Sequence, residues 1–261
     1  MKKQRTKKNQ ISVCIITGNE ELNIRRCLES VTWADEIIVV DSFSKDKTVS
    51  IVKEYTERVY EHRWLGYIGQ KAVAKSLATC EWVLFVDADE VVSDDLRIEI
   101  ETLAENGFPD DVNGYEFPRL VWFLGRWIRH GDWYPDSKLR LFRRKRGKCG
   151  GTEPHERIEI EGEMKSLTAP LYHYTYKNIS DQVNTLNRFS TISADGFSRN
   201  RPKYKIIAGM LVNAPFRFFR CYIIKGGFLD GIPGLIIAVA ASFATIIKYA
   251  KQWERCQTNK K

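Results

Sequence analysis

Paired cysteines, a leading apolar segment and internal repeats are all missing from this chain of 261 residues. The six cysteines are scattered and none forms a Cys-x-x-Cys pair, so we expect reduced thiols rather than a disulfide framework or a zinc site. The first ten residues are polar, and no signal-peptide core follows them. We therefore expect the protein to remain in the cytosol or on the cytosolic face of a membrane.

A glycine-rich phosphate loop is also missing after the first apolar run, Ile11–Thr17. Such loops hold nucleotide phosphates in several enzyme classes, and the absence of one weighs against a nucleotidyltransferase. That class stays open as an alternative, because it also places paired aspartates on parallel sheets.

Acidic side chains are scarce at the two ends of the chain. Residues 2–8 hold five positive side chains, and residues 197–261 carry a net charge of +10. Because the whole chain has a net charge of +8, the residues between must carry −7. Basic ends on an acidic body suit an anionic membrane surface, and we expect no nucleic-acid partner.

Short apolar runs alternate with helical patterns in the first half of the chain. The runs are rich in β-branched residues, as buried parallel strands are. The alternation predicts an α/β fold with a mostly parallel sheet and helices on both faces. Strands are expected at 11–17, 36–40, 59–60 and 81–86, and helices at 19–31, 48–55, 66–79 and 94–106. After residue 107 the pattern is mixed, with strands expected at 114–124, 139–144, 153–160 and 171–176 and a helix at 180–199.

Polar clusters follow three of the expected strands. In open α/β sheets, ligands bind outside the carboxyl ends of the strands. Convergence of several clusters at that edge predicts a binding site there. The clusters are Thr17-Gly18-Asn19-Glu20, Asp41, and Asp87-Ala88-Asp89.

The Asp87-Ala88-Asp89 motif is the sharpest signal in the chain. Two carboxylates at a spacing of two can hold a hard divalent cation, which then offsets charge on a diphosphate leaving group. The alternative is a solvated strand end that caps the next helix. The position of the motif, facing the other acidic clusters, favours the metal site.

Single charged residues each have a structural interpretation beside the functional one. Asp41 can hydrogen-bond a base or a ribose, or it can be a turn residue. Glu20 can contact a donor, or it can be an acid at a helix start. Lys71 can meet a phosphate or a carboxylate of the site, or it can be a solvated helix lysine.

The second half of the chain offers acceptor-side candidates. Glu156 can take the proton of an acceptor hydroxyl, although a carboxylate in a charged stretch is usually solvated. His173 can add a metal ligand, although a histidine between tyrosines is more often structural. The basic run from Arg140 to Arg146 can meet a phosphate, or it can be an exposed hairpin end.

Three apolar stretches near the end of the chain suggest contact with a membrane. Residues 206–212 and 216–224 are separated by Pro215, and Arg217 and Arg220 interrupt the second stretch. Residues 231–247 carry no charge over 17 positions, which is at the edge of the length that spans a bilayer. Arginines interspersed with aromatic residues favour helices that lie in the membrane interface. A pair of packed core helices is the alternative.

The segment ISVCIITGNEELNIRRCLESVTWADEIIVVDSFSKDKT and the later EWVLFVDADE resemble glycosyltransferase family 2, the inverting enzymes with the GT-A fold. The stretches GDWYPDSKLRLFRR, HERIEI, LYHYTY and FLDGIPG are similar to the branch that includes lipopolysaccharide core β-glucosyltransferases. The resemblance implies a GT-A domain at 11–200, with a donor half at 11–106 and an acceptor half at 107–200. A disordered basic tail at 1–10 would precede it, and a helical membrane-facing extension at 201–261 would follow.

The resemblance also implies roles for individual residues. Many family members use the Asp of a Glu-Asp pair as the base, but this chain has no such pair in that place and offers His155-Glu156 instead. We therefore expect Glu156 to be the base, with Asp132 and Asp136 as alternatives. Thr17, Asn19 and Glu20 would line the nucleotide pocket, Asp41 would contact the base of the nucleotide, Lys71 and Asp87 would lie near the diphosphate, and Asp89, Asp87 and His173 would hold Mg²⁺ or Mn²⁺.

The expected reaction is transfer of a sugar from a nucleotide-sugar donor, with UDP as its nucleotide, to a lipid-linked glycan such as the lipopolysaccharide core. The enzyme would work as a peripheral protein on the inner face of the plasma membrane. A polyprenyl-phosphate sugar synthase, which shares the fold and the donor, is the main alternative. A membrane or nucleic-acid adaptor without enzymatic activity is a further one.

Overall fold

The computed structural model describes residues 6–153, 155–196 and 202–258. The chain divides into two compact units. The first contains Met1–Leu120 and Asp136–Tyr174, and the second contains Val121–Pro135 and Thr175–Lys261. The helical unit is therefore larger than an extension over 201–261, because the helix before residue 200 and a short ribbon from the middle of the chain belong to it.

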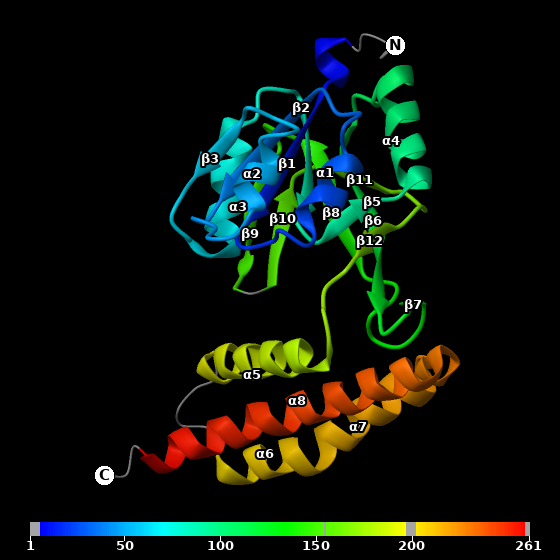
Figure 1. Ribbon diagram of the computed structural model, residues 1–261. Coiled ribbons are helices and arrows are strands. Elements are labelled where there is room, and N and C mark those ends of the chain that lie inside the picture. Colours follow the sequence, from blue (N-terminus) through cyan, green and yellow to red (C-terminus); the bar gives the residue numbers. More distant parts are fainter. Residues whose placement is uncertain (1–5, 154, 197–201, 259–261) are drawn as a thin grey trace. The chain divides into compact units, whose positions relative to one another are not determined.

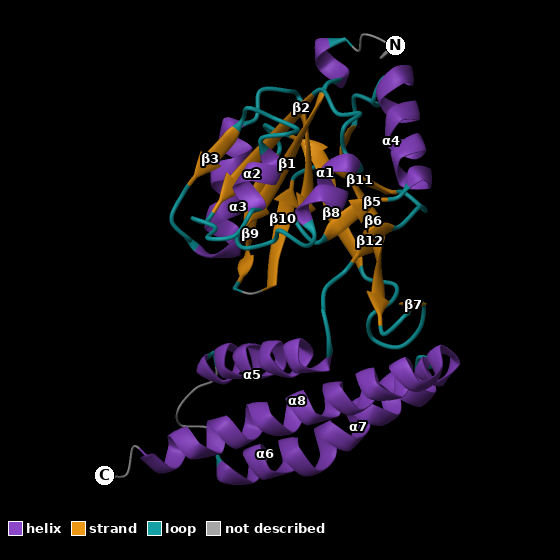
Figure 2. Cartoon of the chain, in the orientation of Figure 1, coloured by secondary structure: helices purple, strands orange, loops and turns teal. Residues whose placement is uncertain are grey.

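A mixed sheet forms the centre of the first unit (Figures 1 and 2). Within the described residues the sheet has ten strands, in the order β3-β2-β1-β4-β8-β6-β12-β5, and β11 and β7 pair with β6. The strands are β1 (Ile11–Thr17), β2 (Glu36–Asp41), β3 (Val59–Glu61), β4 (Trp82–Asp87), β5 (Glu90–Val92), β6 (Val112–Phe123), β7 (Arg126–Ile128), β8 (Ser137–Arg143), β11 (Glu163–Ser166) and β12 (Leu171–His173).

Parallel and antiparallel pairs both occur among the described strands of this sheet. Strands β3, β2, β1 and β4 run parallel, whereas β8 is antiparallel to both β4 and β6. Strand β11 is parallel to β6. A separate antiparallel hairpin is formed by β9 (Gly147–Thr152) and β10 (His155–Ile160).

Helices cover both faces of the parallel strands, as the alternation of apolar residues predicts. Val13 and Ile15 of β1 face a core with α1 (Ile24–Glu29), α2 (Thr48–Val52) and α4 (Asp94–Asn106). Cys14 and Ile16 face a second core with α3 (Gly66–Leu77). The period of two along a strand produces this division, and the predicted Rossmann-like GT-A architecture is confirmed.

The first predicted helix, 19–31, is wrong in its length, because α1 begins only at Ile24. Asn19 has a φ of 58°, which is the left-handed region. The backbone N–H groups of Asn19, Glu20 and Glu21 donate to side chains of the loop after β2. A right-handed helix cannot include a residue in the left-handed region, and the side chains after β2 hold the chain in this non-helical loop as far as Glu21.

The second unit consists of helices and the short β6–β7 ribbon. A continuous helical segment, Lys203–Ile224, comprises α6 (Lys203–Ala208), the π-helical η2 (Gly209–Asn213), α7 (Ala214–Phe219) and the π-helical η3 (Arg220–Ile224). Pro215 lacks a backbone N–H, and the π turn lies just before it. The remaining helices are η1 (Lys7–Asn9) of the first unit and α5 (Ile179–Asp195), η4 (Gly227–Asp230) and α8 (Gly231–Thr258) of the second.

Two helical segments of the described chain are long and apolar enough to cross a membrane, Lys203–Ile224 and Gly227–Gln257. Helix α8 continues well beyond residue 247, where the uncharged run in the sequence ends. Length and composition alone do not decide between crossing a bilayer and lying on it.

All six cysteines are free thiols, which confirms the absence of disulfides. Cys14, Cys27, Cys80 and Cys221 are buried. Burial raises the pKa of Cys27 well above its usual value, and the nearby carboxylates Glu90, Asp89 and Asp87 raise it further.

Candidate active site

The carboxyl ends of the parallel strands bring the predicted donor residues to one edge of the sheet. In the strand register, Thr17 lies beside Asp41, and Ile16 lies beside Asp87. Asp41 in turn lies beside Glu61 of β3. The loops that follow β1, β2 and β4 therefore begin at the same edge, where open α/β sheets bind ligands.

Asn19 and Glu20 hold the loops after β1 and β2 together. Ser44 Oγ accepts the Asn19 N–H at 2.7 Å, and Asn19 Oδ1 accepts the Lys45 N–H at 2.8 Å. The Glu20 N–H donates to Thr48 Oγ1 at 2.8 Å. Glu20 thus shapes the mouth of the predicted nucleotide pocket through its backbone N–H, and Asn19 does so through its backbone N–H and its side-chain oxygen.

Asp41 is fully buried, and its carboxylate closes the turn that follows β2. One oxygen accepts the Ser44 N–H at 2.7 Å, and the other accepts the Ser44 hydroxyl. Each oxygen of Asp41 thus already accepts one bond from Ser44, and contact between Asp41 and a nucleotide base stays a prediction. Close by, the buried Thr17 Oγ1 has no hydrogen-bond partner within the described chain and is available to a ligand.

Asp87 lies between two buried cations. Its Oδ1 is 2.9 Å from Lys71 Nζ, and its Oδ2 is 2.8 Å from an Arg140 guanidinium nitrogen. The Lys71 side chain is only 2% exposed. Lys71 is therefore buried at the site and is not a solvated helix lysine. Of its two interpretations in the sequence, the structure agrees with the one in which Lys71 meets a carboxylate of the site.

The charge of Asp87 is stabilised by these two partners. Burial would raise the pKa of Asp87, but the charges of Arg140 and Lys71 outweigh it and hold the pKa well below its usual range. Asp87 is thus ionised over the whole physiological pH range, and both of its oxygens are already engaged with cations.

Asp89 has different surroundings, although it is only two residues away. Its Oδ2 lies 3.1 Å from Nε2 of His173, and its backbone oxygen accepts the Tyr174 N–H at 2.9 Å. Antiparallel pairing of β5 with β12, which sets Glu90 opposite His173, brings these residues together across 84 positions of sequence. The structure thus joins two of the three predicted metal ligands and directs Asp87 to Lys71 and Arg140.

The Asp89–His173 pair fits a divalent cation. The two atoms are hydrogen-bonded at 3.1 Å, and two adjacent ligands that each lie about 2.1 Å from an octahedral ion are also about 3 Å apart, so an ion could replace the shared proton with little movement. No group of three or more His, Cys, Asp or Glu side chains suited to a metal occurs among the described residues. Mg²⁺ and similar ions commonly take one or two protein ligands and complete their shell with phosphate and water.

Glu156 belongs to the same site as Asp87. Its Oε1 accepts a hydrogen bond from Lys71 Nζ at 2.7 Å, so that one lysine bridges the two carboxylates. Of the alternative bases, Asp136 pairs with Arg119 and Lys138 in the first unit. Asp132 lies in the second unit.

Three side chains of the candidate site are not singled out as site residues by the sequence. Arg140 contacts Glu90 at 3.2 Å as well as Asp87, and Glu90 also accepts the Asp87 N–H at 2.9 Å. Gln70 is fully buried, donates to Ser42 Oγ, and leaves its amide oxygen without a partner in the described chain. The sequence offers one signal for Arg140, because it lies in the basic run for which a phosphate contact is one of the two interpretations.

The other arginines of that run have structural roles. Arg143 donates to the backbone oxygens of Val112 and Pro109, and Arg144 donates to the backbone oxygen of Cys80. Only Arg140 of these three reaches the carboxylates at the strand ends.

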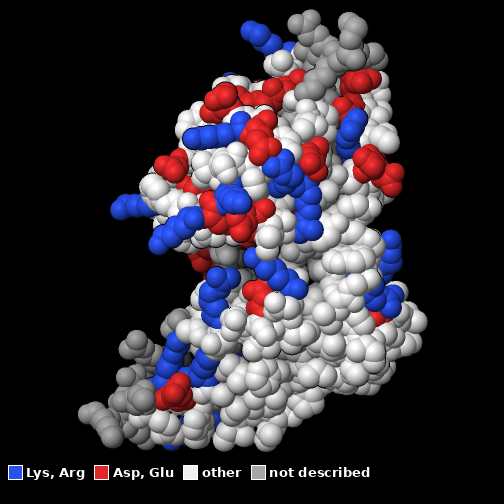
Figure 3. Space-filling model, viewed as in Figure 1, with Lys and Arg blue, Asp and Glu red and all other residues white. Residues whose placement is uncertain are grey.

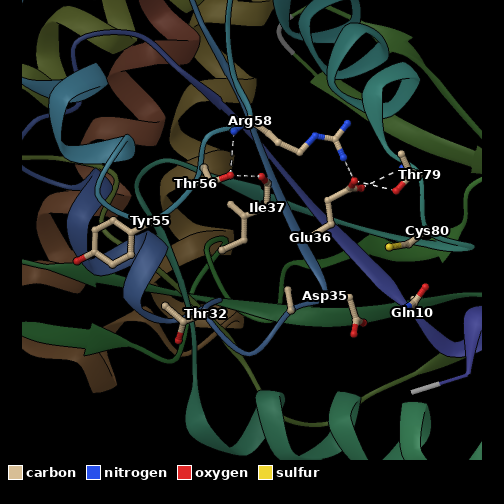
Figure 4. Close-up of a pocket in the computed structure, with 11 residues that line it drawn as sticks. Gln10, Thr32, Asp35, Glu36, Ile37, Tyr55, Thr56, Arg58, Thr79 and Cys80 are labelled. Carbon is tan, nitrogen blue, oxygen red and sulfur yellow. Dashed lines mark hydrogen bonds and ion pairs between the residues drawn. The ribbon is translucent and has the colours of Figure 1, made fainter. Parts of the chain in front are cut away.

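A cavity of about 490 Å³ lies at the opposite, amino-terminal ends of the parallel strands (Figure 4). Glu36 in its wall accepts the Thr79 N–H at 2.9 Å and pairs with Arg58. These charges satisfy each other, and the cavity is separated by the length of the strands from the Asp89–His173 pair. It is therefore not the predicted donor pocket.

Comparison with known proteins identifies the family. The family model described as glycosyl transferase family 2 matches residues 12–158. A glycosyltransferase of Rickettsia typhi is 31% identical over 93% of this chain and 86% of its own length. The lipopolysaccharide core biosynthesis glycosyltransferase LpsC of Rhizobium meliloti is 31% identical over 94% of this chain and 92% of its own length.

Among solved structures, S. aureus TarS 1–349 is 13% identical with a TM-score of 0.45, over 96% of this chain and 92% of that one. The extent of the family match and the identity to the two relatives show that the chain belongs to glycosyltransferase family 2.

Proposed function

We propose that the protein transfers a sugar from a UDP-linked donor to a lipid-linked glycan at a membrane surface, with inversion of the anomeric configuration. The single observation that carries the proposal is the Asp89–His173 pair beside the Lys71–Asp87–Arg140 cluster at the strand ends. Similarity to LpsC over most of both chains supports a glycan of the lipopolysaccharide core as the acceptor.

The donor would lie along the edge formed by the loops after β1, β2 and β4. Thr17 and Gln70 would offer their unpaired buried oxygens to the nucleoside. Lys71 and Arg140 are the cations closest to the place expected for the diphosphate. A divalent ion held by Asp89 and His173 would neutralise charge on the departing diphosphate.

Asp87 would position cations rather than contact the sugar. It fixes Lys71 from one side and Arg140 from the other, so neither cation has to reorganise when a diphosphate binds. Asp89 keeps its oxygens for the ion, apart from the His173 contact. The two aspartates of one motif would therefore have different functions.

Glu156 would take the proton of the acceptor hydroxyl. Lys71 holds Glu156 Oε1 at 2.7 Å and thereby orients the carboxylate. The deprotonated hydroxyl would attack the anomeric carbon from the face opposite the diphosphate, which inverts the configuration. One displacement needs one base, and Glu156 is the predicted base that shares a partner with Asp87.

Replacing Asp89 by Ala should abolish sugar transfer while leaving the fold intact, because the side chain is partly exposed and its loss removes one ion ligand. Transfer is measured as product formed from UDP-sugars with extracts or purified core glycan as acceptor. A thermal-shift screen of nucleotides and UDP-sugars with and without Mn²⁺ should show metal-linked stabilisation of the wild type only. Near-normal turnover of Asp89→Ala would refute the assignment of Asp89 as an ion ligand. If sugar is transferred to polyprenyl phosphate alone, polyprenyl phosphate replaces the lipid-linked glycan as the acceptor.

Asp87→Asn and Asp89→Asn should differ in stability. Asp87→Asn leaves two buried cations short of a partner and should lower the free energy of unfolding by about 3 kcal/mol or more. Asp89→Asn removes one partly exposed pair and should cost less than about 1 kcal/mol. Denaturant unfolding of the two variants beside the wild type measures both values.

The pH dependence of unfolding gives a second reading of Asp87. Its folded pKa is depressed below an unfolded value of about 3.9, so the stabilisation is present at neutral pH and is lost as the pH falls below about 4. Asp87→Asn should flatten the stability curve in that acidic window. Equal losses of stability in Asp87→Asn and Asp89→Asn, or an unchanged acid limb in Asp87→Asn, would contradict the role of Asp87 as the partner of two buried cations.

Glu156→Gln should lower kcat by roughly 10² to 10⁴-fold, the usual contribution of general base catalysis. The KM for the donor and the melting temperature should stay near those of the wild type, because Lys71 keeps Asp87 as a partner. Asp136→Asn is the matched control and should retain most of the activity. A normal kcat for Glu156→Gln, or a large fall in kcat for Asp136→Asn alone, would assign the role of the base to Asp136 in place of Glu156.

A further inference from the structure

The helices of the second unit form a layer with α8 in the middle. Helix α5 and the Lys203–Ile224 segment lie on either side of α8 (Figure 1). Near its C-terminal end, α8 is tied to α5 by Lys251, whose Nζ donates to the Asn187 backbone oxygen at 2.7 Å and to Ser190 Oγ at 2.8 Å. The start of α5 lies near the β6–β7 ribbon, because Tyr176 contacts the rings of Phe123 and Trp133.

The turn between the two apolar helices is bound to that same ribbon. The buried Asp230 carboxylate accepts the N–H groups of Arg129 and His130 at 3.0 and 2.8 Å. The Gly131 N–H donates to the Lys225 backbone oxygen at 2.9 Å. The start of α8 is therefore held by the loop after β7, and its later part is held by α5, all within the second unit.

This arrangement opposes a crossing of the bilayer. Helix α5 extends for about 25 Å along α8, close to the thickness of the hydrocarbon core, so it would have to cross together with α8. It carries Asp181, Asn184, Asn187 and Arg188 among its largely polar side chains. Charged and amide groups at the centre of a bilayer are strongly disfavoured.

Large apolar side chains nevertheless remain exposed along the two apolar helices. The surface over α7 and α8 is mostly free of charged side chains in Figure 3. Leu211 is 71% exposed, and Ile232 is 69% exposed. An apolar surface of this extent on a soluble protein indicates an interaction site. Further exposed residues are Ile207, Val212, Phe216, Phe219, Ile223, Ile224, Phe228, Leu229, Val239, Phe243 and Ile246.

Basic side chains gather at one end of this apolar surface. Arg217, Arg220 and Lys225 all contact Asp132, at 3.0, 3.2 and 3.2 Å. The Asp132 side chain is 7% exposed, whereas the three cations are 36–45% exposed. One buried carboxylate thus gathers three cations and leaves an excess positive charge at the surface, beside exposed Phe216.

We infer that the second unit is a monotopic anchor that inserts the apolar surface of Lys203–Ile224 and α8 into one leaflet of a bilayer. Neither helix crosses, and anionic lipid phosphates meet Arg217, Arg220 and Lys225 at the level of the headgroups. Apolar area and adjacent positive charge are the two properties that such a leaflet recognises. The inference deepens the proposed action at a membrane surface, on which it rests.

Site-specific labelling decides whether α8 crosses. Lys225→Cys and Gln257→Cys place thiols near the two ends of α8 at exposed positions. Both are treated with a membrane-impermeant maleimide in inside-out and right-side-out vesicles from the expression host, and peptide mass spectrometry separates them from native cysteines. Both thiols should react in the same vesicle orientation. Reaction of the two thiols in opposite orientations would overturn the inference.

Co-sedimentation with vesicles tests the surface itself. The wild type should bind phosphatidylcholine vesicles that contain phosphatidylglycerol at least tenfold more tightly than pure phosphatidylcholine vesicles. The double variant Leu211→Glu, Phe216→Glu should lose at least tenfold in affinity. The matched control Ile98→Glu, Met164→Glu changes exposed apolar residues of the first unit and should bind as the wild type does.

The outcomes of the vesicle experiment are separable from the proposed function. The anchor is refuted if the two double variants bind vesicles with equal affinity, or if the wild type shows no preference for the anionic lipid. It is also refuted if the wild type associates with itself and not with vesicles, which would show that a second copy covers the surface. The rate of UDP-sugar hydrolysis in the absence of vesicles should be the same for the wild type and for both double variants. If the wild type binds vesicles but does not hydrolyse UDP-sugars, the enzyme proposal is refuted and the anchor is retained.

Discussion

The site depends on a series of charges that alternate in sign and are centred on the buried Lys71, Arg140 and Glu90. Each buried ion in the series is stabilised only while its neighbours remain, because a buried charge without a partner is strongly destabilising. The series therefore fixes helix α3, the hairpin strand β10 and four strands of the sheet relative to one another within the first unit. In order, it contains Glu156, Lys71, Asp87, Arg140, Glu90, Arg119 and Asp136.

Local patterns in the sequence predict much of this architecture. The apolar run Ile11–Thr17 is a strand with the predicted bounds, and Asp94–Asn106 is a helix with the predicted bounds. Ser93 accepts the Leu96 N–H and acidic residues fill the first turn, so the start of α4 is set by neighbours in sequence. The two-faced core follows from the same local periodicity. Elements whose causes lie within a few residues are thus predictable.

Contacts between distant segments are not predictable in this way. Nothing near Arg140 shows that strand β8 carries it into the sheet beside Asp87, because its surroundings are basic and suggest an exposed end. His173 is suggested by its chemistry, but its partner Asp89 depends on the β5–β12 register. The early start predicted for α1 fails for a related reason, since Ser44 and Thr48, which lie 25 or more residues away, bind a loop in which Asn19 has a left-handed backbone.

The different surroundings of Asp87 and Asp89 follow from the position at which β4 ends. In a continued strand, residues two apart would point to the same side of the sheet. Strand β4 ends at Asp87, which is still held in the sheet beside Ile16, and the chain then turns before β5. Asp87 therefore faces the cations of α3 and β8, while Asp89 lies in the turn and faces β12. One short motif in this way both holds Lys71 and Arg140 in place and leaves a carboxylate beside a histidine, because the strand ends between its two aspartates.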